Sequence, residues 1–249
     1  MKNLILLIIF SLSTLSSNPK PDDYLKSSLG LSALVYSQFF FSPLPSLSRE
    51  RKVEHVNQFD IKVRKSLKWK SNNLGSASSV SDFLLYGLTL GSIPIIPFFS
   101  EDNYYENLIT RVNILSLNGL ITNLVKITTN RERPKYRFNS IKEKSNETYK
   151  SFFSGHTSTA FSIGISNAII LSKQFPKHST KIWFASTSIA AAAGYLRIAS
   201  DEHYASDIIA GSIVGSIVGL FLHKSNKNQN FNFSPSFNSI HLSIHINKE

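Results

Sequence analysis

Long apolar segments, separated by short polar connections, occupy the middle and the C-terminal half of the chain. Five of them have apolar residues at helical spacing, which predicts helices over roughly 80–99, 104–130, 155–173, 179–199 and 204–223. In the last segment Gly211, Gly215 and Gly219 are four residues apart, so we expect a smooth helix face for close contact with another helix. The pattern predicts an all-α fold, a helical bundle of about five core helices.

The two ends of the chain have different patterns. Residues 18–48 contain four prolines around an apolar stretch, and we expect them to be irregular. Residues 54–69 alternate apolar and charged positions at helical spacing, which predicts an amphipathic helix. The C-terminal part is rich in asparagine and serine and then alternates apolar and polar residues, which predicts a short β-like segment, an edge strand or a hairpin. We therefore divide the chain into an N-terminal extension, a core and a polar tail: 18–79, 80–223 and 224–249.

The first residues resemble a secretory signal peptide. Lys2 provides the positive charge, the run from Leu4 to Phe10 is apolar, and the following residues up to Ser17 are small and polar enough for cleavage. An uncleaved anchor is the alternative, although the apolar run is short for a membrane span. We expect residues 1–17 to be removed and the protein to be exported, to the periplasm or to the outer face of the cytoplasmic membrane. The chain has no cysteine, which excludes a disulfide and a lipid anchor on cysteine.

Three short polar segments beside the apolar helices carry the candidate chemistry. They supply three cations, two histidines, one carboxylate and a serine–glycine pair: Lys126, Arg133, Arg197, His156, His203, Asp207, Ser154 and Gly155. Fixed cations and N–H donors stabilise the charge that spreads over phosphoryl oxygens during transfer. We expect the last helical segment to carry His203 and Asp207 in its first turns, on one face and one turn apart. The carboxylate could then hold one imidazole nitrogen and leave the other free to attack phosphorus. These residue types therefore suit phosphate binding and transfer.

The order and spacing of these segments resemble the type 2 phosphatidic acid phosphatase (PAP2) and vanadium haloperoxidase superfamily. Its pattern is Lys-x6-Arg-Pro, Pro-Ser-Gly-His and Ser-Arg-x5-His-x3-Asp, and the resemblance covers roughly residues 80–222. The resemblance implies that His203 is the nucleophile, Asp207 its orienting carboxylate and His156 the general acid and base. It implies no metal and no other cofactor, and it implies five phosphate ligands: Lys126, Arg133, Ser154, Gly155 and Arg197.

Two positions depart from the superfamily pattern. Phe153 replaces the proline of the second segment, and Leu196 replaces the serine before the arginine of the third. Neither position supplies a charge or a proton, but loss of the proline can alter the turn that presents Ser154 and His156. Each segment alone also fits a simpler interpretation, namely charges at a helix end, a plain helix start or a surface ion pair. Their joint occurrence favours a phosphate site.

The chain is strongly basic, with a net charge of +11 and a pI near 9.7. Nucleic acid is a common partner for such charge, but the predicted export argues against it, and anionic lipids or phosphorylated substrates explain the charge equally well. The mean hydropathy of −0.05 is low for a bundle largely in lipid, and Arg111 is costly there. The segments 80–99 and 204–223 nevertheless fit a membrane. We expect a membrane-associated protein, with a soluble exported bundle as the alternative.

The sequence thus predicts an exported, metal-independent phosphatase that acts through a phosphohistidine. We expect its substrate to be a phosphate monoester or a diphosphate, on a phosphorylated lipid or on a small phosphate ester, and we expect no nucleic acid partner. Two alternatives stay open. One is a vanadate-dependent haloperoxidase, and the other is a non-catalytic phospholipid-binding protein of the cell envelope.

Overall fold

The computed structural model describes residues 21–40, 56–100, 104–138, 140, 147–228, 231–236 and 239–244. The expected signal peptide, residues 1–17, lies outside this part of the chain. The elements follow in this order: α2 (Pro21–Phe40), α3 (Gln58–Leu67), the 3₁₀ turn η2 (Ser71–Asn73), α4 (Leu74–Asp82), the π-helix η3 (Phe83–Leu90), α5 (Ser92–Ile95), the 3₁₀ turn η4 (Ile96–Phe99), α6 (Tyr104–Thr129), α7 (Pro134–Arg137), α8 (Gly155–Gln174), the 3₁₀ turn η5 (Pro176–His178), α9 (Ser179–Ala199), α10 (Ala205–Asn228), β1 (Phe231–Ser236) and β2 (Ser239–Ile244).

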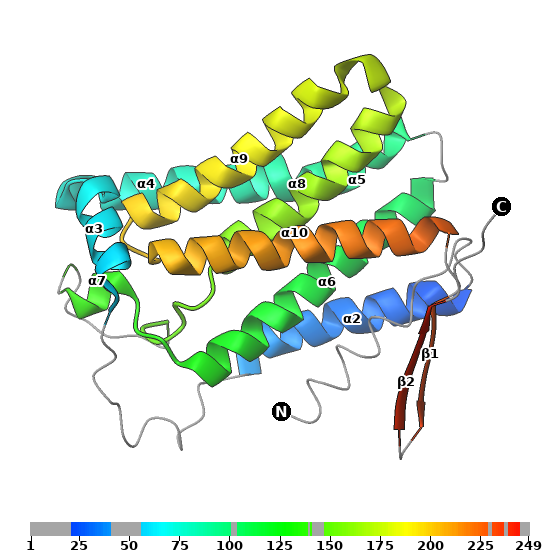
Figure 1. Cartoon of the computed structure of the whole chain (residues 1–249), viewed down its shortest axis with the longest axis horizontal. Helices are drawn as coiled ribbons and strands as arrows, with labels where there is room; N and C mark the ends of the chain where they lie inside the picture. The colour runs from blue at the N-terminus through cyan, green and yellow to red at the C-terminus, as the bar shows by residue number, and fades with distance from the viewer. Residues whose placement is uncertain are drawn as a thin grey trace.

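The predicted all-α bundle is confirmed (Figure 1). Helix α8 packs against α6, α9 and α10, while α4 packs against α9. Four of the five predicted segments are single long helices, and the first is divided between α4, η3, α5 and η4. Pro94 and Pro97 lie in this divided segment, as expected for residues that interrupt a helix.

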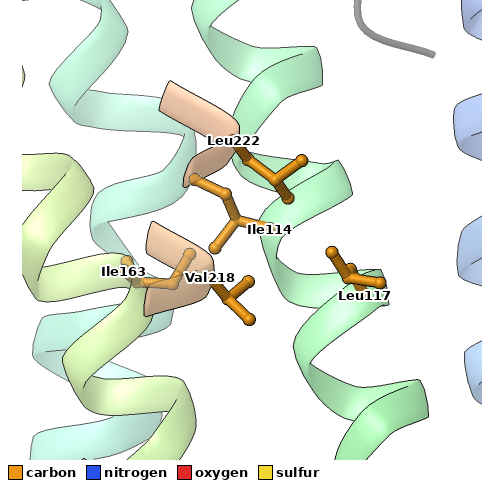
Figure 2. Close-up of a cluster of buried hydrophobic side chains, with 5 residues drawn as sticks. All are labelled: Ile114, Leu117, Ile163, Val218 and Leu222. Carbon is orange, nitrogen blue, oxygen red and sulfur yellow. The ribbon is translucent and has the colours of Figure 1, made fainter. Parts of the chain in front are cut away.

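A cluster of aliphatic side chains joins three of the long helices (Figure 2). Ile114 and Leu117 come from α6, Ile163 from α8, and Val218 and Leu222 from α10. Each is at most 5% exposed. Complete burial of one such side chain contributes about 1.5–3 kcal/mol, so this cluster fixes the relative positions of the three helices.

The four-residue spacing of glycines in α10 serves close packing on α8, as predicted. A Cβ atom on Gly215 would lie 2.1 Å from the Ser158 carbonyl oxygen, and one on Gly211 would lie 2.7 Å from that of Ser154. Real Cβ atoms do not approach a backbone oxygen so closely, so the two helices are in backbone contact. This contact extends to Ser154, where α8 begins.

The expectation that residues 18–48 are irregular is wrong for the described part, because residues 21–40 form α2. Pro21 lies at the first position of this helix, where proline is favoured and does not interrupt hydrogen bonding. Helix α2 packs on α6, and a Cβ atom on Gly119 would lie 2.3 Å from the Leu34 side chain. The proline that begins this helix was therefore misinterpreted as a residue that prevents one.

The amphipathic helix predicted over residues 54–69 is observed as α3. Asn57 caps it, because its side-chain oxygen accepts a hydrogen bond from the Asp60 N–H at 2.7 Å. The helix packs on α9 and α10. Asp60 is fully buried at this contact.

Among the described residues, three helical stretches are long and apolar enough to cross a membrane: Ser71–Phe99, Tyr104–Arg137 and Ala205–Leu222. The second qualifies although it contains Arg111, which is fully buried and donates to Ser92 and Asn167. Apolar side chains also recur on the outer face of α10, where Ile213 is 54% and Ile217 is 60% exposed. These features indicate a membrane-associated protein.

The C-terminal part contains a two-stranded antiparallel hairpin. Strand β1 pairs with β2 in a register that places Phe231 opposite Ile244 and Ser236 opposite Ser239. The predicted β-like segment is thereby confirmed. Helix α10 ends at Asn228, five residues later than the predicted boundary at residue 223.

Candidate active site

The three polar segments meet at one end of the bundle, around a cavity of about 320 Å³. Six of the eight predicted site residues line it: Lys126, Arg133, Gly155, His156, Arg197 and His203. Ser154 and Asp207 are fully buried beside it, and the Ser154 N–H donates to the Asp207 carbonyl oxygen at 3.1 Å. The fold therefore gathers predicted site residues that are up to 81 positions apart, from Lys126 to Asp207.

The first segment follows a sharp end of α6. Asn130 has a φ of 50°, in the left-handed region that asparagine tolerates, and its N–H donates to the Lys126 carbonyl oxygen at 3.1 Å. The chain then leaves the helix axis and starts α7 at Pro134. Lys126 thus stays in the last turn of α6, while Arg133 reaches the cavity from the connection.

The second segment forms the start of α8. The Ser154 side chain caps this helix, accepting from the Thr157 N–H at 3.4 Å and from the Thr157 hydroxyl at 2.9 Å. A Cβ atom at Gly155 would lie 3.5 Å from the Lys126 amino group, at ordinary contact distance, so this cation lies close to the start of α8. Phe153 is buried, and the cap forms with this residue in place of the proline.

The third segment differs from its prediction, because His203 does not belong to the helix that carries Asp207. Helix α10 begins at Ala205, and His203 lies in the preceding turn, where its N–H donates to the Arg197 carbonyl oxygen at 3.1 Å. Asp201, with a φ of 63°, reverses the chain there. A helical i,i+4 relation between His203 and Asp207 is therefore not formed.

The contact between His203 and Asp207 is looser than a hydrogen bond. His203 Nδ1 lies 3.6 Å from Asp207 Oδ2, and among the described residues this nitrogen has no hydrogen-bond partner. The Asp207 carboxylate accepts at shorter distances from Arg131 Nη1 (2.5 Å), Ser151 Oγ (2.6 Å) and the Tyr204 N–H (2.9 Å). Asp207 is thus held rigidly beside the histidine.

Carboxylates contact the two arginines of the cavity. Arg133 Nη2 donates to Glu147 at 2.9 Å, and its Nη1 donates to Glu202. Arg197 lies 3.6 Å from Glu202 and 3.6 Å from Asp82. Burial alone would raise the pKa of Glu202, but Arg133, Arg197 and Lys135 lower this pKa to about 2. Glu202 is therefore ionised at any working pH and keeps the guanidinium groups oriented.

Both histidines are held in the neutral form. Burial and the neighbouring Arg197 lower the pKa of His156 to about 4, although a hydrogen bond of 2.8 Å between its Nε2 and Asp82 opposes this shift. Burial, Arg133 and Arg197 lower the pKa of His203 well below its usual value. A neutral imidazole has a free nitrogen lone pair, which a nucleophile or a base requires.

The sequence predictions missed four charged residues of this site: Asp82, Arg131, Glu147 and Glu202. Arg131 and Glu202 lie inside the first and third polar segments, between residues that were predicted for the site. Their charge at these positions could have indicated that they belong to the site. Asp82 is 74 residues from His156 in the chain, and no local pattern connects the two.

The fold and the cavity define an all-helical protein with a cationic, histidine-containing site at helix ends. The family model described as the PAP2 superfamily matches residues 108–231, and the chain belongs to this superfamily. The fold is also similar to the "first transmembrane PAP2 type phosphatidylglycerolphosphate phosphatase from Bacillus subtilis", with a TM-score of 0.55 and 18% sequence identity. This similarity covers 80% of the present chain and 94% of the other. No curated protein matches the sequence.

Proposed function

We propose that this protein is a metal-independent phosphatase that hydrolyses a phosphate monoester or a diphosphate through a phosphohistidine. One observation carries the proposal: a single cavity collects Lys126, Arg133 and Arg197 together with His156 and His203. Three fixed cations balance the charge of a phosphoryl group, and two histidines with different surroundings can divide nucleophilic attack and proton transfer between them.

In the proposed first step His203 attacks phosphorus, and the bond to the leaving oxygen breaks. His156, which also lines the cavity, donates a proton to that oxygen, so an alcohol or, from a diphosphate, a phosphate monoester leaves with this oxygen protonated. A bound phosphate dianion raises the low pKa of His156, because negative charge nearby favours the protonated ring. In the second step His156 takes a proton from water, whose oxygen attacks the phosphohistidine and releases phosphate.

The phosphate ligands in this proposal are those implied by the superfamily pattern. Arg133 and Arg197 offer planar N–H forks to two phosphate oxygens, and Lys126 adds a point charge from α6. Gly155 and the capped start of α8 add backbone N–H groups at a helix N-terminus, a position that favours anions. Arg133 also donates to Glu147 and Glu202, so phosphate would share its guanidinium with these carboxylates.

We further propose that the substrate is a phosphorylated lipid and that the site faces the outer side of the cytoplasmic membrane. Apolar residues line part of the cavity, including Leu85, Leu90 and Leu115. They could contact the part of a lipid that lies next to its phosphate group. Three helical stretches suit a membrane, and the similar solved structure is that of a phosphatidylglycerolphosphate phosphatase. Export rests on the signal-peptide pattern of residues 1–17.

The test is phosphate release by the purified protein in detergent, without added metal. Phosphatidate, phosphatidylglycerol phosphate, a polyprenyl diphosphate and p-nitrophenyl phosphate form the panel, beside His203→Ala and His156→Ala. We expect release from at least one lipid by the parent and its loss in both variants. Release only from p-nitrophenyl phosphate would reject the lipid substrate alone. No release by folded protein would reject the phosphatase, and vanadate-dependent halide oxidation or lipid binding without turnover would then identify the alternatives.

A further inference from the structure

Helix α3, which lies outside the residues matched by the family model, holds the segment that carries His203. Figure 1 shows α3 beside the connection between α9 and α10. Helix α3 and Trp69, which follows it, contact this segment on both sides of His203, at three pairs of residues: Trp69 with Ala199, Arg64 with Asp201, and Asp60 with Ser206. The first is a backbone hydrogen bond of 3.0 Å.

The contact before His203 is a two-fold ion pair. Arg64 Nε and Nη2 donate to the two carboxylate oxygens of Asp201 at 2.6 and 2.7 Å. Asp201 is fully buried, has the left-handed φ of 63°, and also accepts from Ser140 at 2.6 Å. A planar guanidinium fork fixes a carboxylate in direction as well as in distance, so Arg64 determines the orientation of this reversal of the chain.

The contact after His203 is a buried carboxylate at the start of α10. Asp60 accepts from the Ser206 N–H at 2.8 Å and from the Ser206 hydroxyl at 2.7 Å. It also accepts from Arg131 Nη2 at 2.9 Å, and the other end of the same guanidinium donates to Asp207. One arginine thus connects α3 to the carboxylate that lies 3.6 Å from His203.

The charges of this network depend on one another. Asp60 and Asp207 are both fully buried, and Arg131 lies between them. Removal of one partner from a buried ion pair leaves a charge without compensation, and the remaining groups then move or recruit water. Without the Asp60 charge, Arg131 would be drawn towards Asp207 alone. The hydrogen bond from the Ser206 N–H to the Asp60 carboxylate would weaken at the same time.

We propose that Asp60 and Arg64 are positioning residues for the phosphoryl transfer. Holding the turn from both sides, they keep the imidazole of His203 directed at phosphorus. A displacement of about 1 Å at a reacting group can reduce the rate about 100-fold, so such support affects catalysis directly. This inference rests on the proposed function of His203 as the nucleophile.

The test compares Asp60→Asn and Arg64→Gln with Lys62→Gln, which changes an exposed lysine on the same helix. Each protein is mixed rapidly with the ³²P-labelled lipid of the panel above that the parent hydrolyses fastest, in detergent micelles, and quenched in alkali, which preserves phosphohistidine. The amplitude of the first phase counts active molecules, and its rate constant reports the attack. We expect the rate constant to fall about 10- to 100-fold in the first two variants, with the amplitude and the inhibition constant for inorganic phosphate within about twofold. Lys62→Gln should match the parent.

The outcomes separate the two proposals. A reduced amplitude with the parental rate constant would show that α3 supports folding only, and it would overturn this inference alone. A folded parent that forms no phosphoenzyme would overturn the proposed function and this inference with it. If Arg64→Gln does not fold, Arg64→Lys retains the charge without the planar fork, and a rate constant equal to that of the parent would again overturn the inference.

Discussion

The regions around His156 and His203 differ in their exposure to solvent and in the number of elements that hold the histidine in place. His156 lies in the first turn of α8 with 24% of its side chain exposed, and its partner Asp82 is 43% exposed. His203 lies in a turn with 1% of its side chain exposed, beside the fully buried Asp207. The first region can exchange protons with water, whereas the second is shielded and held from several elements.

This difference supports the two proposed roles on physical grounds, apart from the superfamily pattern. A general acid and base must receive a proton and later activate water, so it needs access to solvent. A nucleophile must approach phosphorus along one line, so it gains from rigid surroundings. His156 meets the first requirement, and His203 meets the second.

The largest effect is expected for His203→Ala. Without the nucleophile no phosphohistidine can form, so we expect the rate of phosphate release to fall by about four orders of magnitude or more. The measurement is release from the preferred lipid together with trapping of labelled protein. His178→Ala, at an exposed histidine outside the cavity, is the matched control and should retain full activity. Turnover above a tenth of the parental rate in His203→Ala would contradict the role of this histidine.

A smaller effect is expected for His156→Ala, because the nucleophile remains. Loss of the acid and base should reduce turnover of a lipid phosphate about 10²- to 10⁴-fold. With p-nitrophenyl phosphate the leaving group needs no proton, so the phosphoenzyme should form and then accumulate. The measurement is a burst of nitrophenol followed by slow release of phosphate. If this variant formed no phosphoenzyme from the activated ester, the two regions would not differ in role.

The pairing of His156 with Asp82 should appear in the pH dependence. Burial lowers the pKa of His156 to about 4 in the ligand-free protein, and Asp82 opposes that shift. Asp82→Asn removes the opposing charge, so the pKa falls further and less of the acid is protonated at a given pH. We expect turnover to fall about three- to tenfold at neutral pH, with the alkaline limb of the profile displaced to lower pH. Asp82→Glu keeps the charge and should show a smaller displacement; an unchanged profile in both variants would reject the pairing.

Much of the fold followed from local sequence patterns. Apolar spacing located the long helices, and the four-residue glycine spacing indicated the face of α10 that meets α8. The exceptions also have local causes. Pro21 was taken as a break although it begins α2, and His203 was placed in a helix although Asp201 reverses the chain before it. A proline is favoured in the first turn of a helix but interrupts one further along, and a residue with a left-handed φ ends one helix before the next begins. The residue types alone do not show which of these positions a residue occupies.

The candidate site was predictable only as far as its motifs reach. The eight residues of the three segments could be named because their order and spacing match the superfamily pattern, and the structure places them around one cavity or directly beside it. Asp82 and Asp60 could not be named, because their partners lie in distant parts of the chain. Such pairs form only when particular helices pack together, and the pattern of a single sequence does not show which side chains of different helices will meet.

The smallest effect on activity is expected where α8 and α10 join the two regions. A Cβ atom on Gly211 would lie 2.7 Å from the Ser154 carbonyl oxygen, so Gly211→Ala must push the two helix backbones apart next to the His156 turn. Overpacking of this kind costs about 1–3 kcal/mol, and we expect a lower melting temperature with a few-fold loss of turnover. Gly75→Ala in α4 is the control, because no atom lies within 4 Å of its added Cβ. It should melt at or slightly above the parental temperature. Equal melting temperatures and equal rates in both variants would mean that the spacing of the two histidine regions does not depend on this contact.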